Sequence, residues 1–174
     1  MATTYYQKQL ESGQAFERFV EAQLARFGII LDPCVTQRDQ IEIGENRFGL
    51  EIKNDATMER TGNVYIELAE KSDARNDRFI ASGIYRPDNS TWYGIGHARE
   101  FLVFKKIALQ VLHTNGTYRL VEIPTSRGFL LPLEEARCLC HRRFNAGLSG
   151  AWISQGPHVS QQTLRDFWPQ DGFR

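Results

Sequence analysis

Residues 44 to 55 read Gly-Glu-Asn-Arg-Phe-Gly-Leu-Glu-Ile-Lys-Asn-Asp, and the second half of this stretch alternates apolar and charged side chains. In an extended strand, successive side chains point to opposite faces. Glu51 and Lys53 therefore share one predicted face, and Leu50 and Ile52 share the other. The stretch predicts a strand that holds a carboxylate beside an ammonium group, with its apolar face against a core.

Helical and extended patterns lie on both sides of this strand. Residues 12 to 28 place apolar side chains at helical spacing and finish on Gly28, which is typical of a helix C-terminus. Alternation in residues 41 to 52, with a turn around Gly44, predicts a β-hairpin that includes the strand. Residues 64 to 68 predict a third strand, so the order is helix, strand, strand, strand.

The second half of the chain predicts more elements of both kinds. In order, these are a hairpin of residues 82 to 85 and 92 to 95, a buried strand at 101 to 104, an amphipathic helix at 105 to 113, a strand at 118 to 123, and a helix from Pro132 to about Phe144. The last thirty residues, about a sixth of the chain, have no clear pattern. Together the elements predict an α/β fold with a mixed central β-sheet flanked by helices.

Composition places the chain among globular proteins. Its 174 residues, 41% hydrophobic and 24% charged, predict one domain spanning residues 1 to 174. No apolar run is long enough for a membrane span, and three cysteines are too few for a disulfide framework. Because residues 1 to 8 also lack an apolar signal core, we expect a cytoplasmic protein.

Acidic and basic residues balance at 21 each, so any polyanionic partner must be attracted by local positive charge. The residues that could supply this charge are Arg75, Arg78, Arg86, Lys105, Lys106, Arg137, Arg142 and Arg143. The Lys105–Lys106 pair opens a predicted helix, where it is either solvated or in contact with a phosphate backbone.

The pairing of Glu51 with Lys53 fits the needs of phosphodiester hydrolysis. That reaction uses a hard divalent cation, held by oxygen ligands, to neutralise transition-state charge and to lower the pKa of the attacking water. Glu51 can supply one such ligand. A neighbouring lysine can orient the water or stabilise charge that develops on the phosphate, and Lys53 fits that role.

Glu51-Ile52-Lys53, preceded by a predicted hairpin and by a helix that carries Glu17, resembles the PD-(D/E)XK nuclease superfamily. This superfamily includes restriction endonucleases, archaeal Holliday-junction resolvases and phage exonucleases. The resemblance covers roughly residues 12 to 70. It implies a restriction-endonuclease-like core, Mg²⁺ or Mn²⁺ as cofactor, Glu51 and Lys53 as catalytic residues, and Glu17 as a supporting metal ligand.

The second metal-binding acid departs from the family pattern, because no Pro-Asp stands on the strand before Glu51. Three residues compete for the role. Asp39 is the usual residue type, Glu45 lies in or beside the predicted turn, and Glu42 faces away from its apolar neighbours. Asp39 and Glu45 are favoured equally over Glu42. Glu67, on the following predicted strand, is a further metal ligand if it faces the same cleft.

The resemblance predicts a Mg²⁺-dependent endo- or exodeoxyribonuclease, with RNA not excluded as substrate and a homodimer as one possible assembly. It also makes an origin in phages or mobile elements plausible. The alternative is a catalytically inactive member of the same fold that binds nucleic acid or protein, because the family aspartate is missing.

Two other motifs have competing interpretations. Cys138, Cys140 and His141 suggest zinc, but a structural zinc site needs four ligands, so buried cysteines are the favoured interpretation. Tyr85, Trp92 and Tyr93 flank a predicted turn and could stack on bases, although core packing of a hairpin is favoured.

Overall fold

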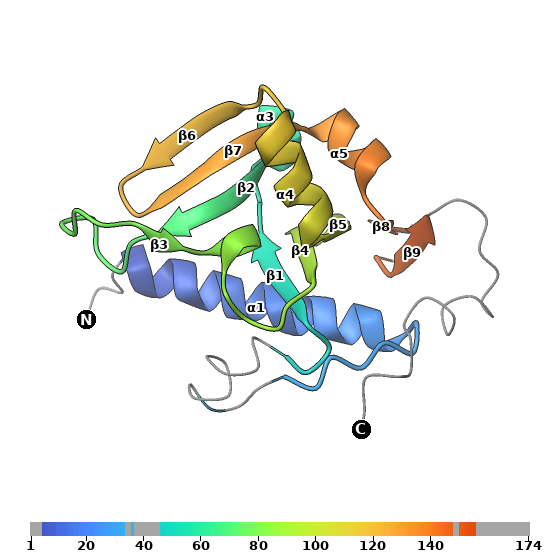
Figure 1. Ribbon diagram of the computed structural model, residues 1–174. Coiled ribbons are helices and arrows are strands. Elements are labelled where there is room, and N and C mark those ends of the chain that lie inside the picture. Colours follow the sequence, from blue (N-terminus) through green and yellow to red (C-terminus); the bar gives the residue numbers. More distant parts are fainter. Residues whose placement is uncertain (1–4, 34–35, 37–45, 148–149, 156–174) are drawn as a thin grey trace.

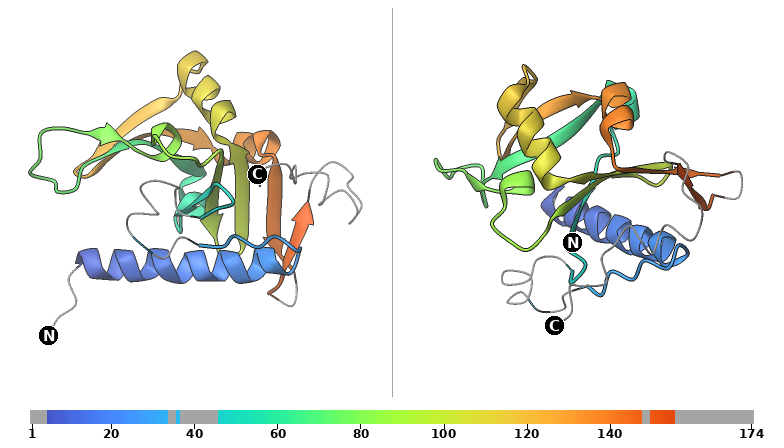
Figure 2. Two further views of the ribbon diagram at one scale, coloured as in Figure 1. Left: turned by 60° about the horizontal axis from the view of Figure 1, so that its bottom comes forward. Right: turned by 45° about the vertical axis from the view of Figure 1, so that its right-hand side comes forward.

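Three layers of secondary structure form the part of the chain that the computed structural model describes, residues 5–33, 36, 46–147 and 150–155. A long helix, α1 (Tyr5–Ala25), covers one face of a five-stranded sheet, and a four-stranded sheet packs against the other face (Figures 1 and 2). The predicted α/β architecture, a mixed β-sheet flanked by helices, is therefore confirmed. The second sheet was not expected.

The five-stranded sheet is mixed because β1 runs parallel to β4 while the remaining neighbours are antiparallel. Its spatial order is β1-β4-β5-β8-β9. The strands are β1 (Leu50–Asn54), β4 (Trp92–His97), β5 (Glu100–Lys105), β8 (Arg142–Ala146) and β9 (Trp152–Gln155).

The four-stranded sheet is antiparallel throughout and has the order β3-β2-β7-β6. Its strands are β3 (Ile80–Ala81), β2 (Asn63–Glu70), β7 (Ser126–Pro132) and β6 (Arg119–Ile123). Four short helical elements connect the strands of the two sheets: α3 (Met58–Thr61), the 3₁₀ turn η1 (Gly83–Tyr85), α4 (Lys106–Asn115) and α5 (Leu133–Leu139).

The layer between α1 and the mixed sheet is apolar. Phe16, Val20 and Leu24, spaced four residues apart, are all buried against it. Each such side chain stabilises the fold by about 1.5–3 kcal/mol. On the sheet, Phe101 lies across Gly94, where an added Cβ would be 2.3 Å from the ring. Only glycine leaves room for this ring at the centre of the layer.

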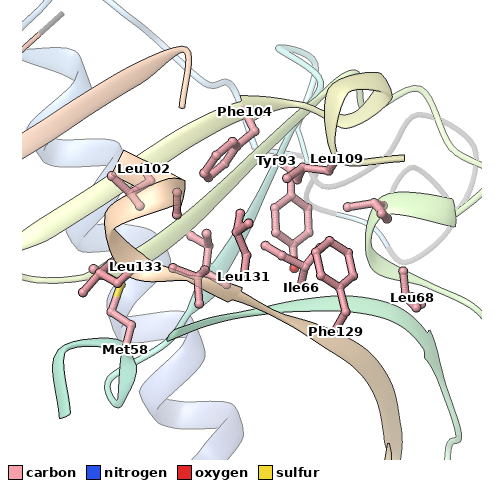
Figure 3. Packing of buried hydrophobic residues seen from close by; sticks show 14 residues of the cluster. Met58, Ile66, Leu68, Tyr93, Leu102, Phe104, Leu109, Phe129, Leu131 and Leu133 are labelled. Atoms are coloured by element: carbon pink, nitrogen blue, oxygen red, sulfur yellow. The ribbon is translucent and has the colours of Figure 1, made fainter. Parts of the chain in front are cut away.

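The layer between the two sheets contains the second hydrophobic cluster (Figure 3). Tyr93 of β4 reaches toward Ile66 of β2 and Phe129 of β7 in this layer. Leu109 of α4 and Leu133 of α5 pack against the same cluster. Because Tyr93 and Ile66 each have 0% exposure, solvent does not reach this part of the interface between the sheets.

Most of the predicted elements are present. The first helix starts earlier than expected, at Tyr5, and the left-handed Gly28 (φ 76°) follows its end. Strands β2, β5 and β6 and helix α4 correspond to the predictions for residues 64 to 68, 101 to 104, 118 to 123 and 105 to 113. Of the hairpin predicted within residues 41 to 52, the first strand lies outside the described residues, and the second is present as β1.

Two predictions are wrong. The hairpin of residues 82 to 85 and 92 to 95 does not form, because residues 83 to 85 make the turn η1 while β4 pairs with β1 and β5. The helix that begins after Pro132 ends at Leu139, and the chain continues as β8, whose register with β5 buries Phe144. Among the described residues, no helix has the length and apolar character needed to cross a bilayer.

Candidate functional site

Glu51 is a carboxylate with no solvent exposure, held on β1 between the two sheets. Lys53 Nζ lies 3.0 Å from Oε1, and Lys106 Nζ lies 2.8 Å from Oε2. Within the described part of the chain, neither oxygen accepts a hydrogen bond of good geometry. Two ammonium groups therefore balance the charge of Glu51, but among the described residues no donor makes a well-directed hydrogen bond to its oxygens.

Lys53 lies on the same face of β1 as Glu51, as the alternation predicts, and links Glu51 to Glu67. Its ammonium is 3.6 Å from Oε1 of Glu67 on β2. Glu67 is also fixed by two hydroxyl groups, since Ser82 Oγ donates to Oε1 at 2.8 Å and Ser126 Oγ donates to Oε2 at 3.0 Å. Glu67 and Glu51 thus lie on either side of one cation.

Local backbone features hold Glu67 in this position. Asp55, directly after β1, accepts the backbone N–H of Tyr65 through Oδ2 (3.1 Å), which ties β1 to β2. The pairing of β2 with β7 shifts register between Glu67 and Ala69, and such bulges re-aim side chains. Gly83 has φ 52°, and a Cβ there would lie 2.2 Å from the Glu67 carbonyl oxygen. Glycine therefore permits the close approach that brings Ser82 to Glu67.

Lys106 is the main site residue that the sequence interpretation missed, because Lys105 and Lys106 were expected to be solvated or to contact a phosphate backbone. Its side chain is only 6% exposed. Besides Glu51, its ammonium contacts Asp88 Oδ1 at 3.3 Å and donates to Ser90 Oγ. A signal was available: Lys106 lies three residues before Leu109, so both belong on the buried face of α4.

Glu17 of α1 lies within electrostatic reach of Lys53. Burial raises the pKa of Glu17 above its ordinary value, and the positive charges of Lys53 and Arg18 oppose this rise. A half-buried carboxylate beside Lys53 is compatible with the supporting role that the resemblance implies.

Tyr93 adds a buried phenol to the same region. Burial, followed by the charge of Glu51, raises the pKa of Tyr93 well above its usual value, so the phenol stays protonated. The prediction that Tyr93 packs in the core is correct, although the packing lies between sheets rather than within a hairpin.

The remaining predicted metal ligands, Asp39 and Glu45, and their rival Glu42 lie outside the described residues. Within the ranges that the structure does describe, no three His, Cys, Asp or Glu side chains group as a metal site. The predicted Mg²⁺ or Mn²⁺ site therefore remains a prediction.

The favoured burial of both cysteines is wrong for one of them. Cys138 is exposed, whereas Cys140 is partly buried. Burial is the main cause that raises the pKa of the Cys140 thiol to about 11, so this sulfur stays protonated at neutral pH. His141 packs against Trp92, with ring centroids 4.8 Å apart. Nothing in this arrangement favours zinc.

Several of the basic residues proposed as a local positive surface are engaged in ion pairs. Arg137 and Arg143 bind the buried Glu100, and Arg75 binds Asp73. Arg137 and Arg143 are therefore engaged at a buried carboxylate, and Arg75 is paired with an acid two residues away.

Comparisons with protein-family models, with curated proteins and with solved structures each found no match for this chain. The function therefore has to be argued from the site itself.

Proposed function

We propose that the chain is a metal-dependent nuclease with a PD-(D/E)XK, restriction-endonuclease-like core that hydrolyses phosphodiester bonds of DNA. The observation that carries this proposal is the environment of Glu51: a fully buried carboxylate beside Lys53, which also approaches Glu67. Glu17, from the first helix, adds a third carboxylate within reach of the lysine's charge.

Burial of these charges supports a functional origin. Transferring a carboxylate from water into a protein interior costs several kcal/mol even after relaxation. An apolar residue at position 51 would fill the layer between the sheets at lower cost. A site that needs a dry carboxylate for chemistry gives a reason to keep Glu51.

The donor set fits a hard cation in kind, because carboxylate oxygens are the ligands that Mg²⁺ and Mn²⁺ accept. Glu51 would be one ligand and Asp39 or Glu45 a second, with Glu67 and Glu17 in supporting positions. When bound, the cation would neutralise charge on the scissile phosphate and acidify the attacking water. Lys53, on the open side of Glu51 at 28% exposure, would orient that water or stabilise the phosphate charge.

A second candidate function is a binding module that keeps the fold without the reaction. The observation in its favour is that Lys53 and Lys106 already lie within 3.0 Å and 2.8 Å of the two Glu51 oxygens. This ion-pair arrangement balances the charge of Glu51 without a metal ion.

Cleavage assays separate the two candidates. Purified protein is incubated with linear, circular and single-stranded DNA in Mg²⁺ or Mn²⁺, beside Glu51→Gln and Lys53→Met. We expect both substitutions to reduce cleavage by about 100-fold or more, while Glu122→Gln, an exposed acid on β6, leaves it unchanged.

Cleavage that survives both site substitutions would refute the catalytic assignment. DNA binding by the wild type without cleavage in either metal would favour the binding module. Thermal unfolding of each variant shows whether a loss of activity reflects the site or the fold.

A further inference from the structure

A cavity of about 640 Å³ opens beside the ion pairs of Lys106 with Glu51 and Asp88. It lies between the turn that precedes β4 and the first turns of α4. This volume falls within the range of about 300–1,000 Å³ that is typical of small-molecule sites. None of the acids discussed as metal ligands lines it. The cavity is therefore distinct from the carboxylate site, although the two are neighbours.

One wall of the cavity is aromatic. Trp92 and His141 both line it, and their rings pack 4.8 Å apart between centroids. Burial, followed by the charges of Arg142 and Lys105, lowers the pKa of His141 below its ordinary value. The shift favours the neutral imidazole, so the ring adds no charge to the wall. A flat heteroaromatic ligand would find stacking area on this wall.

The cavity also carries excess positive charge. Its lining includes three cations, Arg86, Lys105 and Lys106, and one acid, Asp88, while the buried Glu51 behind the lining also balances Lys106. Asp88 is neutralised internally, since Arg86 Nε lies 3.3 Å from Oδ2 and Lys106 Nζ lies 3.3 Å from Oδ1. Lys105 extends from the exposed edge with its ammonium 5.6 Å from the Trp92 ring centroid. An anionic group would thus be attracted close to the aromatic wall.

We propose that this cavity binds one nucleotide of a DNA single strand, with its base against Trp92 and its phosphate at Lys105. An aromatic surface beside a cation is a combination that binds unstacked nucleotides, because every base has a π-face and every phosphodiester linkage carries a negative charge. A paired and stacked base cannot present its face in this way, so duplex DNA would need local opening.

The inference rests on the proposed nuclease function, because it assigns part of that enzyme's substrate to this cavity. Lys106 connects the two sites: it lines the cavity, and its ammonium lies 2.8 Å from Glu51. A strand seated in the cavity would therefore be separated by the Lys106 side chain from the carboxylate that is proposed to act on it.

Binding without chemistry tests the proposal. A fluorescein-labelled short oligothymidylate is titrated in EDTA with the full-length protein and followed by polarisation. We expect Trp92→Leu to weaken binding by about 5-fold to 150-fold, the range for loss of one stacked base. Trp92→Phe keeps a stacking surface and should retain most of the affinity.

The phosphate contact has its own measurement. Lys105→Gln should reduce the dependence of log affinity on log salt concentration by about 0.7, the value for one phosphate contact in single strands. Arg119→Gln removes an equal charge from β6 in the other sheet and should leave the slope unchanged. The proposal would be overturned if Lys105→Gln and Arg119→Gln had the same salt slope and Trp92→Leu bound the oligonucleotide as tightly as Arg119→Gln.

Two further outcomes separate this inference from the nuclease proposal. Trp92-dependent binding without cleavage in Mg²⁺ or Mn²⁺ would support the nucleotide site and refute the nuclease. Glu51-dependent cleavage that Trp92→Leu leaves unchanged would refute only the nucleotide site. Binding of free thymidine monophosphate without binding of the oligonucleotide would overturn the assignment to a strand.

Discussion

Glu51 and Glu100 are both buried carboxylates on the mixed sheet, yet their partners differ in kind. Glu100 is 2% exposed and receives two hydrogen bonds from Arg137, from Nε at 2.9 Å and from Nη2 at 2.7 Å. Arg143 Nε adds an ion pair at 2.6 Å. Glu51 has only the ammonium groups of Lys53 and Lys106, and no hydrogen bond of good geometry among the described residues.

The difference indicates what each carboxylate can do. A guanidinium is planar and matches both oxygens of a carboxylate, whereas an ammonium is a compact charge on a flexible chain. Burial acts to raise the pKa of Glu100, but the hydrogen bonds of Arg137 and the charge of Arg143 outweigh it and keep the pKa low. Glu100 is thus fixed as a structural anion by directed hydrogen bonds, whereas the oxygens of the buried Glu51 are held by ion pairs with two flexible ammonium groups.

Removing Lys106 should have the largest effect on stability. Lys106→Met keeps the aliphatic stem but leaves the buried Glu51 with one cation fewer, which costs about 3–5 kcal/mol. The free energy of unfolding in urea measures this loss. Lys105→Met is the matched control, because the adjacent lysine is exposed and should change stability by about 0.5 kcal/mol or less.

A double substitution sharpens the same test. Glu51→Gln combined with Lys106→Met removes both charges, so it should destabilise less than the sum of the two single changes. Strict additivity would mean that the 2.8 Å contact contributes nothing to the fold.

Breaking the ion pairs of Glu100 with Arg137 and Arg143, the Glu100 cluster, should reduce stability less than removing Lys106 does. Arg137→Gln removes two charge-assisted hydrogen bonds to Glu100 and the exposed contact with Glu134, but it leaves Arg143 on Glu100, so we expect a loss of about 1.5–3 kcal/mol in urea unfolding. DNA cleavage per folded molecule should not change. A drop in cleavage without a drop in stability would show that the two carboxylates are not separate in function.

Acid should also reduce the stabilisation by the Glu100 cluster, and we expect this loss to be smaller than that caused by Arg137→Gln. Because the pKa of folded Glu100 lies below its ordinary value of 4.5, the cluster stabilises the protein fully above that pH. This contribution is lost as pH falls through the folded pKa. Unfolding measured from neutral to acidic pH should therefore show a shrinking gap between wild type and Glu100→Gln. A constant gap would contradict the assignment.

Substituting Glu17 should change the free energy of unfolding least, and it should raise this free energy instead of lowering it. Its raised pKa means that folding disfavours the ionised form, a cost that is complete above the folded pKa and disappears as pH falls from there to the ordinary pKa. Glu17→Gln should therefore raise the unfolding free energy at neutral pH by about 0.5 kcal/mol or less. Under the nuclease proposal it lowers cleavage, so thermal unfolding and cleavage should move in opposite directions. A destabilised variant would mean that Glu17 acts as a structural partner of Lys53.

Features of the site that depend on local periodicity could be predicted from the sequence. Alternation alone places Glu51 and Lys53 on one face of β1, and it also turns Glu67 away from the apolar side chains beside it. Helical spacing identifies the buried face of α1 through Phe16 and Val20.

The rest depends on contacts between distant segments. Ser82 and Ser126 reach Glu67 from 15 and 59 positions away along the chain. Lys106 reaches Glu51 only because the Asp88–Ser90 turn and the pairing of β4 with β1 bring α4 there. The helix expected up to Phe144 fails for the same reason, since pairing with β5 outweighs the local preference.

The parallel pairing of β1 with β4 has a consequence for how the protein folds. Leu50 aligns with Trp92, so a long loop must close before Glu51 is covered. Until then its carboxylate remains hydrated, and Lys106 arrives only with the segment that follows β5. We therefore expect the contacts of Lys106 with Glu51 to form late in folding, so that Lys106→Met speeds unfolding more than it slows folding in stopped-flow measurements.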